Sequence, residues 1–196
     1  MGEYSFYAML SRMKYINRWG LMNNTKNENI SEHSLQVAIL THCLVLIHNK
    51  YFGGNLNPER GVLLAIFHDA TEIITGDMPT PIKYYNPEIK SAYKKIEDMA
   101  GDRLISLLPD DFKADYERII KMNSDEDRAI KPFVKLADRY SALLKCIDEI
   151  RMGNEEFKSA KLTIEKSIEQ MHMPEAEVFE KKFLPSFYLT LDEQGE

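Results

Sequence analysis

Apolar residues recur at three- and four-residue spacing through most of the chain, which is the pattern of amphipathic α-helices. In the first half, the spacing predicts helices over 6–17, 30–52 and 58–74. The second of these has a capping-box pattern at its start, formed by Asn29 and Glu32. The third begins at the N-cap pair Asn57-Pro58 and is expected to end at Gly76.

The second half repeats this pattern, with helices predicted over 87–108, 111–122, 125–153, 154–171 and from 174 onward. Ser124 and Asp127 resemble a cap for the long segment that follows them. We expect Pro132 to kink or restart that segment, because a proline cannot donate to the preceding turn. No run alternates in the manner of a β-strand, so the predicted fold is all-α, with roughly seven to nine helices.

The chain has 196 residues and a mass of 22.8 kDa, which suits one domain. We expect a single domain over 1–196, with a core of about 28–150 and C-terminal helices over 154–184 packed against it. Twenty-five basic and 31 acidic residues give a net charge of −6. This balance argues against a general nucleic-acid-binding protein, which would carry a basic face.

Two cysteines, Cys43 and Cys146, lie far apart and form no CxxC motif. They are therefore expected to be reduced core residues of a cytoplasmic protein rather than parts of a disulfide framework. The first residues lack the basic start and cleavage site of a signal peptide. No stretch of about 18 residues is apolar throughout, so no membrane span is expected.

Candidate chemistry begins in the third predicted helix. The run 62–67 is apolar almost all round, which predicts a buried central helix, and it ends at His68-Asp69. On a continuous helix Asp69 would share the inward face of Ile66, and Glu72 would follow one turn later. A buried carboxylate is costly unless it has a partner, so a carboxylate at this position calls for an explanation.

Two other helices place polar groups on apolar faces. His33 lies four residues before Val37, and Asp138 lies four residues after Val134. Imidazole and carboxylate ligands together suit divalent cations such as Mn, Fe, Co, Ni or Zn. One metal ion would explain why three separate helices each carry a polar group toward the core.

Simpler interpretations stay open for each residue taken alone. His33 or His68 can be an ordinary hydrogen-bonded core histidine. Asp138 can accept a hydrogen bond from another helix or pair with the nearby Arg139 or Lys135. The spacing by itself does not decide between these structural roles and a metal site.

Several stretches together resemble the HD-domain metal-dependent phosphohydrolases, and most closely the bacterial 5′-deoxynucleotidases. They run from Asn17 to Glu193 and comprise NRWGLM, NISEHSLQVA, HDATEIITGDMPTPIKYYN, VKLADRYSALLKC and FLPSFYLTLDE. The histidines and aspartates named above match the H…HD…D pattern of the larger group. The run that begins at His68 and the early NRW carry the match to the 5′-deoxynucleotidases.

The resemblance implies an all-α homodimer that hydrolyses deoxyribonucleoside 5′-monophosphates to deoxyribonucleosides and phosphate, whatever the base. It implies one divalent metal ion (Co, Mn, Zn, Ni, Fe or Cu) held by His33, His68, Asp69 and Asp138. It places Arg18 at the phosphate and Glu72 in catalysis. Its substrate-binding positions are Arg18, Trp19, His33, Asp69, Asp77, Met78, Pro79, Thr80 and Asp138.

Physical reasoning assigns roles within this set. Arg18 can hold two phosphate oxygens with its planar guanidinium. We expect Glu72 to accept a proton from the attacking water and Asp77 to act as the second carboxylate. The alternative for Glu72 is to orient His68. Trp19 is expected to exclude a 2′-hydroxyl, the alternative being simple packing at a helix end.

The sequence is also compatible with two other functions. The first is an HD phosphohydrolase that acts on triphosphates, cyclic nucleotides or (p)ppGpp, although such substrates usually call for more basic residues than Arg18 and Lys83. The second is a non-catalytic helical interaction module with or without a bound metal, which the charged segment 155–170 would suit. Neither of these includes a nucleic-acid polymer or a membrane as a partner.

Overall fold

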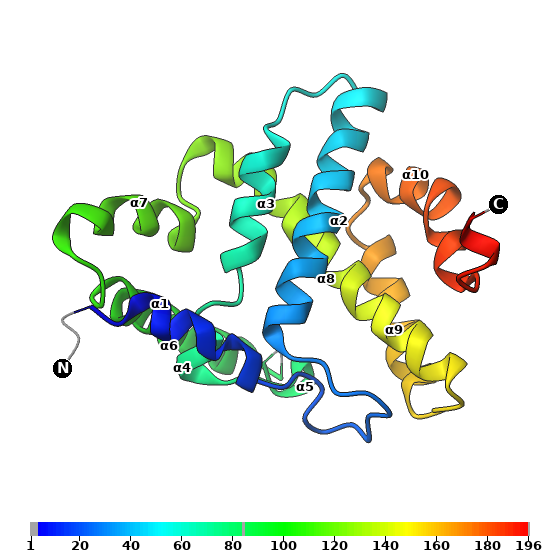
Figure 1. Cartoon of the computed structure of the whole chain (residues 1–196), viewed down its shortest axis with the longest axis horizontal. Coiled ribbons are helices and arrows are strands. Elements are labelled where there is room, and N and C mark those ends of the chain that lie inside the picture. Colours follow the sequence, from blue (N-terminus) through cyan, green and yellow to red (C-terminus); the bar gives the residue numbers. More distant parts are fainter. Residues whose placement is uncertain (1–3, 84, 196) are drawn as a thin grey trace.

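The structure is a computed structural model that describes residues 4–83 and 85–195, and all regular elements in that part are helical (Figure 1). The predicted all-α class is therefore confirmed. The α-helices are α1 Phe6–Leu10, α2 Ile30–Tyr51, α3 Pro58–Phe67, α4 Glu72–Thr75, α5 Thr80–Lys83, α6 Pro87–Ile105, α7 Asp110–Lys121, α8 Asp125–Arg151, α9 Phe157–Glu169 and α10 Pro174–Lys182. Short 3₁₀ segments cover Ser11–Tyr15, Leu184–Tyr188 and Glu193–Gly195.

The core forms where α2 and α3 pack on α8, the longest helix (Figure 1). Val37 and Leu44 of α2, Leu64 of α3, and Ala137 and Tyr140 of α8 are all buried in one cluster. Burial of apolar area stabilises such a cluster by roughly 25 cal/mol per Å². The three helices thus form a rigid frame for any polar group that they carry inward.

Helices α9 and α10 extend the same core. Ile168 of α9 and Phe179 of α10 are buried in the cluster formed by α2 and α8. Side chains cap the N-termini of four helices, and Asn29 forms the complete capping box. Asn29, Asn57 and Ser124 are the caps that the sequence predicts, and Asn86 is the fourth. These caps explain why the predicted starts of α2, α3, α6 and α8 are accurate, whereas the uncapped α9 begins at Phe157 rather than at 154.

The first helix is shorter than predicted. It ends at Leu10, a 3₁₀ turn follows, and Ile16 is extended. The cause is pairing between distant segments, since the carbonyl of Ile16 accepts from the amide of Ile30, and Asn17 bridges to Asn29. The chain around Arg18 is thereby held beside the N-terminus of α2.

The third helix also differs from the expectation. It stops at Phe67, a turn spans 68–71, and α4 begins at Glu72. The prediction that Asp69 shares a helical face with Ile66 is therefore wrong, and Ile66 itself is 38% exposed. The Nδ1 of His68 lies 2.7 Å from the carbonyl oxygen of Ala65, a side-chain bond that satisfies the helix end.

The expected restart at Pro132 is also wrong, because α8 continues through it from Asp125 to Arg151. Pro132 is exposed, whereas its neighbours Ile130 and Phe133 are buried. Burial on the inner face maintains the helix despite the missing donor on the outer face.

By length and hydropathy, α2 is the one helix among residues 4–83 and 85–195 that could cross a membrane. However, 56% of its most apolar window is buried inside the fold. The apolar character of α2 is explained by its packing against α3, α8 and α10. Core helices of this kind meet the same criteria as membrane spans.

Candidate metal centre and active site

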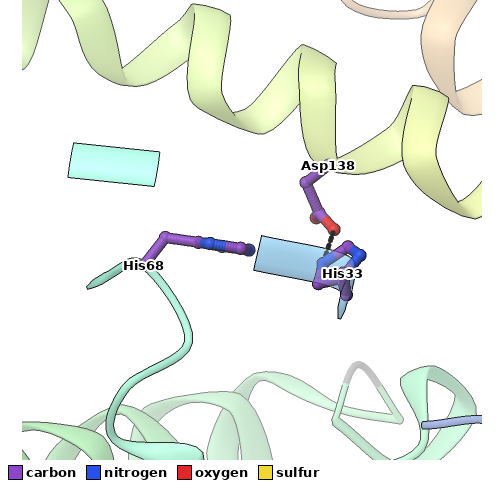
Figure 2. Close-up of side chains that lie close together, drawn as sticks. All are labelled: His33, His68 and Asp138. Atoms are coloured by element: carbon purple, nitrogen blue, oxygen red, sulfur yellow. Dashed lines mark ion pairs between the residues drawn. The ribbon is translucent and has the colours of Figure 1, made fainter. Parts of the chain in front are cut away.

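Four polar side chains from three segments meet at the inner end of α2. Figure 2 shows three of them, His33, His68 and Asp138. His33 comes from the first turn of α2, His68 and Asp69 from the turn after α3, and Asp138 from the middle of α8. One ligand atom each of His33, His68 and Asp138 lies within 4.8 Å of the others, so this group could hold a metal ion. The convergence predicted from the sequence is therefore present.

Asp69 completes the cluster from the turn. Its Oδ2 lies 3.1 Å from the Nε2 of His68 and 3.4 Å from the Nε2 of His33. The Oδ1 of Asp138 lies 3.1 Å from the Nε2 of His33. His33 is fully buried, but Asp138 remains 39% exposed, which leaves the cluster reachable from solvent.

The hydrogen bonds assign the same tautomer to both imidazoles. The hydroxyl of Ser141 donates to Gln36, so Ser141 can only accept from the Nδ1 of His33, 2.9 Å away. The Nδ1 of His68 likewise donates to the carbonyl of Ala65. Each ring therefore directs its Nε2 toward the carboxylates, and in the neutral imidazole this nitrogen carries the lone pair.

Both Nε2 atoms are buried and have no hydrogen-bond partner. Two lone pairs that face the carboxylates of Asp69 and Asp138 repel one another unless a proton or a cation lies between them. A divalent cation would satisfy all of these groups, and its preferred ligands are the ones present. The donor set thus fits a metal ion chemically as well as in spacing.

The pKa values of His68 and Asp69 reflect the same excess of negative charge. Burial favours the neutral ring of His68, but the attraction of the Asp69 carboxylate outweighs it and raises the pKa of His68 to about 9. Burial alone would raise the pKa of Asp69, yet the two histidines hold it well below its usual value. A proton on His68 therefore offsets charge that a metal ion would otherwise neutralise.

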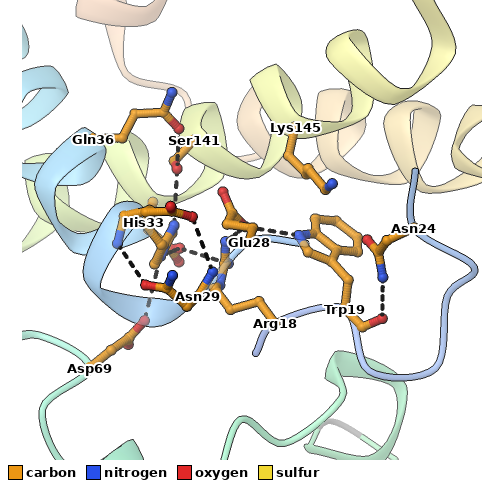
Figure 3. A network of polar contacts seen from close by, with 12 residues as sticks. Arg18, Trp19, Asn24, Glu28, Asn29, His33, Gln36, Asp69, Ser141 and Lys145 are labelled. Carbon is orange, nitrogen blue, oxygen red and sulfur yellow. Dashed lines mark hydrogen bonds and ion pairs between the residues drawn. The ribbon is translucent and has the colours of Figure 1, made fainter. Parts of the chain in front are cut away.

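Arg18 lies next to the cluster (Figure 3). Its Nη2 lies 3.8 Å from the Oδ1 of Asp138, and its Nη1 lies 2.7 Å from the Oε2 of Glu28. Burial opposes the charge, but the surrounding carboxylates raise the pKa of Arg18, so the guanidinium stays protonated. A buried cation beside a metal-type cluster is well placed for an anionic substrate.

Trp19 and Asp77 lie beside Arg18. The Nε1 of Trp19 donates to the Oε2 of Glu28 at 3.1 Å, and the indole ring packs against Phe157 with centroids 5.3 Å apart. Burial raises the pKa of the Asp77 carboxyl, although the charge of Arg18 and the backbone amide of Trp19 act to lower it. The structure therefore brings together three of the residues predicted at the substrate.

Glu72 opens α4 and is buried, and its Oε2 has no hydrogen-bond partner. Burial, reinforced by the charges of Asp69 and Asp77, raises its pKa to about 9. The orienting bond to His68 comes from Ala65 rather than from Glu72. The alternative role of Glu72, to orient His68, is therefore filled by the carbonyl of Ala65.

The remaining predicted positions lie in the segment between α4 and α5. Met78 and Pro79 are partly buried there, and Thr80 begins α5. The side chain of Thr80 lies outside the described part of the chain. Contact of these three residues with a nucleotide stays a prediction.

Sequence reasoning missed Glu28, Ser141 and Gln36. Ser141 is one turn after Asp138 on α8, and this spacing was the only sequence signal for it. Glu28 precedes the N-cap of α2 and has no periodic signal at all. Their partners lie on other segments, so only the tertiary structure reveals these contacts.

The fold is that of the HD-domain phosphohydrolases. A solved HD-domain phosphohydrolase from Listeria innocua superposes with a TM-score of 0.76, at 22% identity, over 95% of this chain and 90% of that one. The order and packing of the helices thus follow a known architecture.

The chain belongs to the YfbR-like 5′-deoxynucleotidase family, whose model matches residues 5–187. A 5′-deoxynucleotidase of Pectobacterium atrosepticum is 51% identical over 195 residues, covering 98% of this chain and 96% of that protein. A 5′-deoxynucleotidase of Vibrio parahaemolyticus is also 51% identical, covering 98% and 99%. The family resemblance expected from the sequence is confirmed.

Proposed function

We propose that the protein hydrolyses 2′-deoxyribonucleoside 5′-monophosphates to deoxyribonucleosides and phosphate, with little demand on the base. One observation carries the proposal: the buried Nε2 atoms of His33 and His68, which have no hydrogen-bond partner, face two carboxylates directly beside Arg18. This arrangement suits a cation and a phosphate side by side. Membership of the 5′-deoxynucleotidase family supports the substrate class.

His33, His68, Asp69 and Asp138 would hold one divalent cation, for which Co, Mn, Zn, Ni, Fe and Cu are the candidates. Such an ion supplies a water of lowered pKa and neutralises phosphate charge. Phosphate monoesters hydrolyse extremely slowly without a catalyst, so the barrier to be lowered is large. The protein's own residues must then bind the substrate, orient its phosphate and protonate the departing oxygen.

Arg18 binds and orients the phosphate. Its guanidinium is buried and protonated, and its Nη1 is engaged by Glu28. The remaining N–H groups can reach the phosphate oxygens and orient the phosphorus for in-line attack. Lys83 is the other nearby cation, but its Nζ is already paired with the Oε1 of Glu97 at 2.8 Å.

Glu72 accepts the proton of the attacking water in this proposal, and Asp77 serves the departing 5′-oxygen. The unpartnered, buried Oε2 of Glu72 supports this role, because it is free to take a proton from substrate-side water. Its pKa of about 9 belongs to the metal-free protein. A dication nearby stabilises the carboxylate and so lowers that pKa into the working range.

Trp19 restricts the sugar. Its ring is held at one face by Phe157 and at its Nε1 by Glu28, so it cannot easily move aside for a 2′-hydroxyl. Met78, Pro79 and Thr80 are proposed to line the rest of the nucleotide site. Base tolerance follows if the base meets apolar groups rather than donors and acceptors.

We further propose a homodimer and a cytoplasmic location. Leu35 and Ile39 of α2 are each more than 60% exposed, and with Ile66 of α3 they form an apolar patch suited to a second copy. Both cysteines are free, and burial raises their pKa values, which suits a reducing compartment. Sedimentation of the purified protein tests the dimer.

The function is tested with a phosphate-release assay after chelation of bound metal. Deoxy- and ribonucleoside mono-, di- and triphosphates are each supplied with Mg, Mn, Co or Zn. We expect turnover of deoxyribonucleoside monophosphates with a transition metal and little release from ribonucleotides. Preferential turnover of triphosphates would replace the proposal with another nucleotide class, and a lack of turnover with every metal would reject it.

A further inference from the structure

Glu28 lies between Arg18, which is proposed to bind the phosphate, and Trp19, which is proposed to contact the sugar (Figure 3). Its Oε2 accepts from the Nη1 of Arg18 at 2.7 Å and from the Nε1 of Trp19 at 3.1 Å. A single oxygen atom thus contacts two consecutive residues at once. The Glu28 side chain is only 14% exposed, so water competes little for these bonds.

The main chain fixes Glu28 as firmly as its side chain. The amide of Arg18 donates to the carbonyl of Glu28 at 2.9 Å, and Asn17 bridges to Asn29 beside it. Asn29 is also the N-cap of α2, the helix that carries His33 in its first turn. Glu28 therefore ties Arg18 to the same helix terminus that positions the candidate metal ligand.

Each partner of Glu28 has an alternative arrangement that would disturb the site. Arg18 already lies 3.8 Å from the Oδ1 of Asp138 and, without Glu28, would pair with that candidate metal ligand instead. Trp19 has a backbone φ of 61°, in the left-handed region that side chains other than glycine rarely adopt. Its indole needs fixed contacts to stay in place, and Glu28 supplies the polar one.

We propose that Glu28 is a positioning residue that orients Arg18 for the phosphate and Trp19 for the sugar through one shared carboxylate oxygen. This inference rests on the proposed function, because Arg18 and Trp19 matter only if a nucleotide binds there. Glu28 itself touches no reacting atom. Its role is to keep the guanidinium away from Asp138 and the indole in a single orientation.

The test compares Glu28→Met with Glu28→Gln, two side chains of similar length. Glutamine keeps an oxygen that can accept both bonds, whereas methionine lacks such an acceptor. We expect Glu28→Met to lose about 100-fold in kcat/KM for dAMP, because misplacement by about 1 Å has that effect. Most of the loss should be a rise in KM. Glu28→Gln should stay within about tenfold of the parent protein, since it keeps the acceptor.

Trp19 is the only tryptophan in the chain, so its fluorescence reports on this contact without any substrate. Acrylamide quenching of that fluorescence should increase in Glu28→Met and stay unchanged in Glu28→Gln. Glu117→Gln, which removes an exposed partner of Lys121 on α7, is the matched control and should alter neither measurement.

Three results would overturn the proposal. Parental kcat/KM in Glu28→Met would show that the contact is not needed, and equal losses in both variants would show that charge matters rather than position. If Glu28→Met does not fold by circular dichroism, Glu28→Gln decides: unchanged quenching with activity within tenfold supports the proposal, and any larger loss overturns it. A parent protein that is inactive on monophosphates would reject the proposed function alone. The difference in acrylamide quenching between Glu28→Met and Glu28→Gln would still test whether Glu28 positions Trp19.

Discussion

The Nδ1 of His33 lies 2.9 Å from the Oγ of Ser141, and this contact determines which nitrogen of the imidazole faces the candidate metal centre. Because Ser141 donates its only hydroxyl proton to Gln36, it must accept from Nδ1. Nε2, which carries the lone pair in the neutral ring, is thereby directed at Asp69 and Asp138. A serine on α8 thus prepares a histidine on α2 to bind a cation.

Replacing Ser141 with alanine should weaken metal binding about 10- to 100-fold, the usual effect of losing a group that orients a ligand. The reason is that His33 would lose the acceptor that fixes its tautomer. Competition with a chromophoric chelator measures the affinity. Ser106→Ala is the control, since that hydroxyl bonds only to its own turn on α6. Parental affinity in Ser141→Ala would show that the tautomer needs no such support.

Replacing Glu72 with glutamine should lower kcat for dAMP by about 10²- to 10⁴-fold, the contribution of a general base. Metal affinity and KM should change little, because the amide has nearly the same shape and the carboxylate is not among the proposed ligands. Steady-state kinetics at saturating metal give both parameters. If Glu72→Gln keeps full turnover, the assignment of the base is wrong.

Replacing Trp19 with alanine should allow AMP to compete with dAMP. The indole is braced by Phe157 and Glu28, so its removal opens space at the sugar without affecting the metal cluster. The ratio of kcat/KM for dAMP and AMP measures the selectivity, and the thermal midpoint serves as a control for folding. An unchanged ratio would assign the selectivity to another residue.

Metal affinity should rise between about pH 6.5 and pH 9. His68 has a pKa of about 9 in the folded, metal-free protein, against about 6.5 when unfolded, because attraction to Asp69 outweighs burial. Its protonation therefore stabilises the metal-free fold fully below pH 6.5, and this contribution is lost as the pH rises through 9. A metal ion must displace that proton, so binding becomes easier over the same range.

Titration calorimetry in buffers of different ionisation enthalpy detects the released protons, and thermal melts of the chelated protein detect the loss of stability. Both should change in the same pH window. A metal affinity that is independent of pH from 6.5 to 9 would contradict a protonated His68.

Replacing Glu149 with glutamine should destabilise the fold by about 3 kcal/mol, the cost of breaking a buried ion pair. Its carboxylate pairs with Lys145 and accepts from the amide of Thr25 at 2.8 Å, so it anchors the loop that follows Trp19. Chemical denaturation measures the change. Glu165→Gln is the control, since its partly exposed i,i+4 pair with Lys161 contributes only about 0.3–0.5 kcal/mol.

The same carboxylate predicts an acid dependence. Burial opposes its charge, but its bonds to Lys145 and to the loop amides hold the pKa of Glu149 below its usual value. Its contribution to stability is therefore present above about pH 4.5, its unfolded value, and is lost as the pH falls below it. Glu149→Gln should show a weaker loss of stability on acidification than the parent protein.

The sequence alone determines the helical class and most helix starts. Caps such as Asn29 and Ser124 act within one turn, so their side chains and targets are adjacent in the sequence and can be read there. The types of residue at His33, His68 and Asp138 also indicate metal chemistry, because such groups are rare on apolar helical faces.

Only the tertiary structure decides how these groups meet. Asp69 reaches both imidazoles from a turn rather than from a helix, since the bond from His68 to Ala65 ends α3 early. Ser141 lies 108 residues from His33 along the chain, so no local pattern can reveal their contact. The chain closes such long-range contacts only when packing of α2, α3 and α8 offsets the entropy of bringing them together.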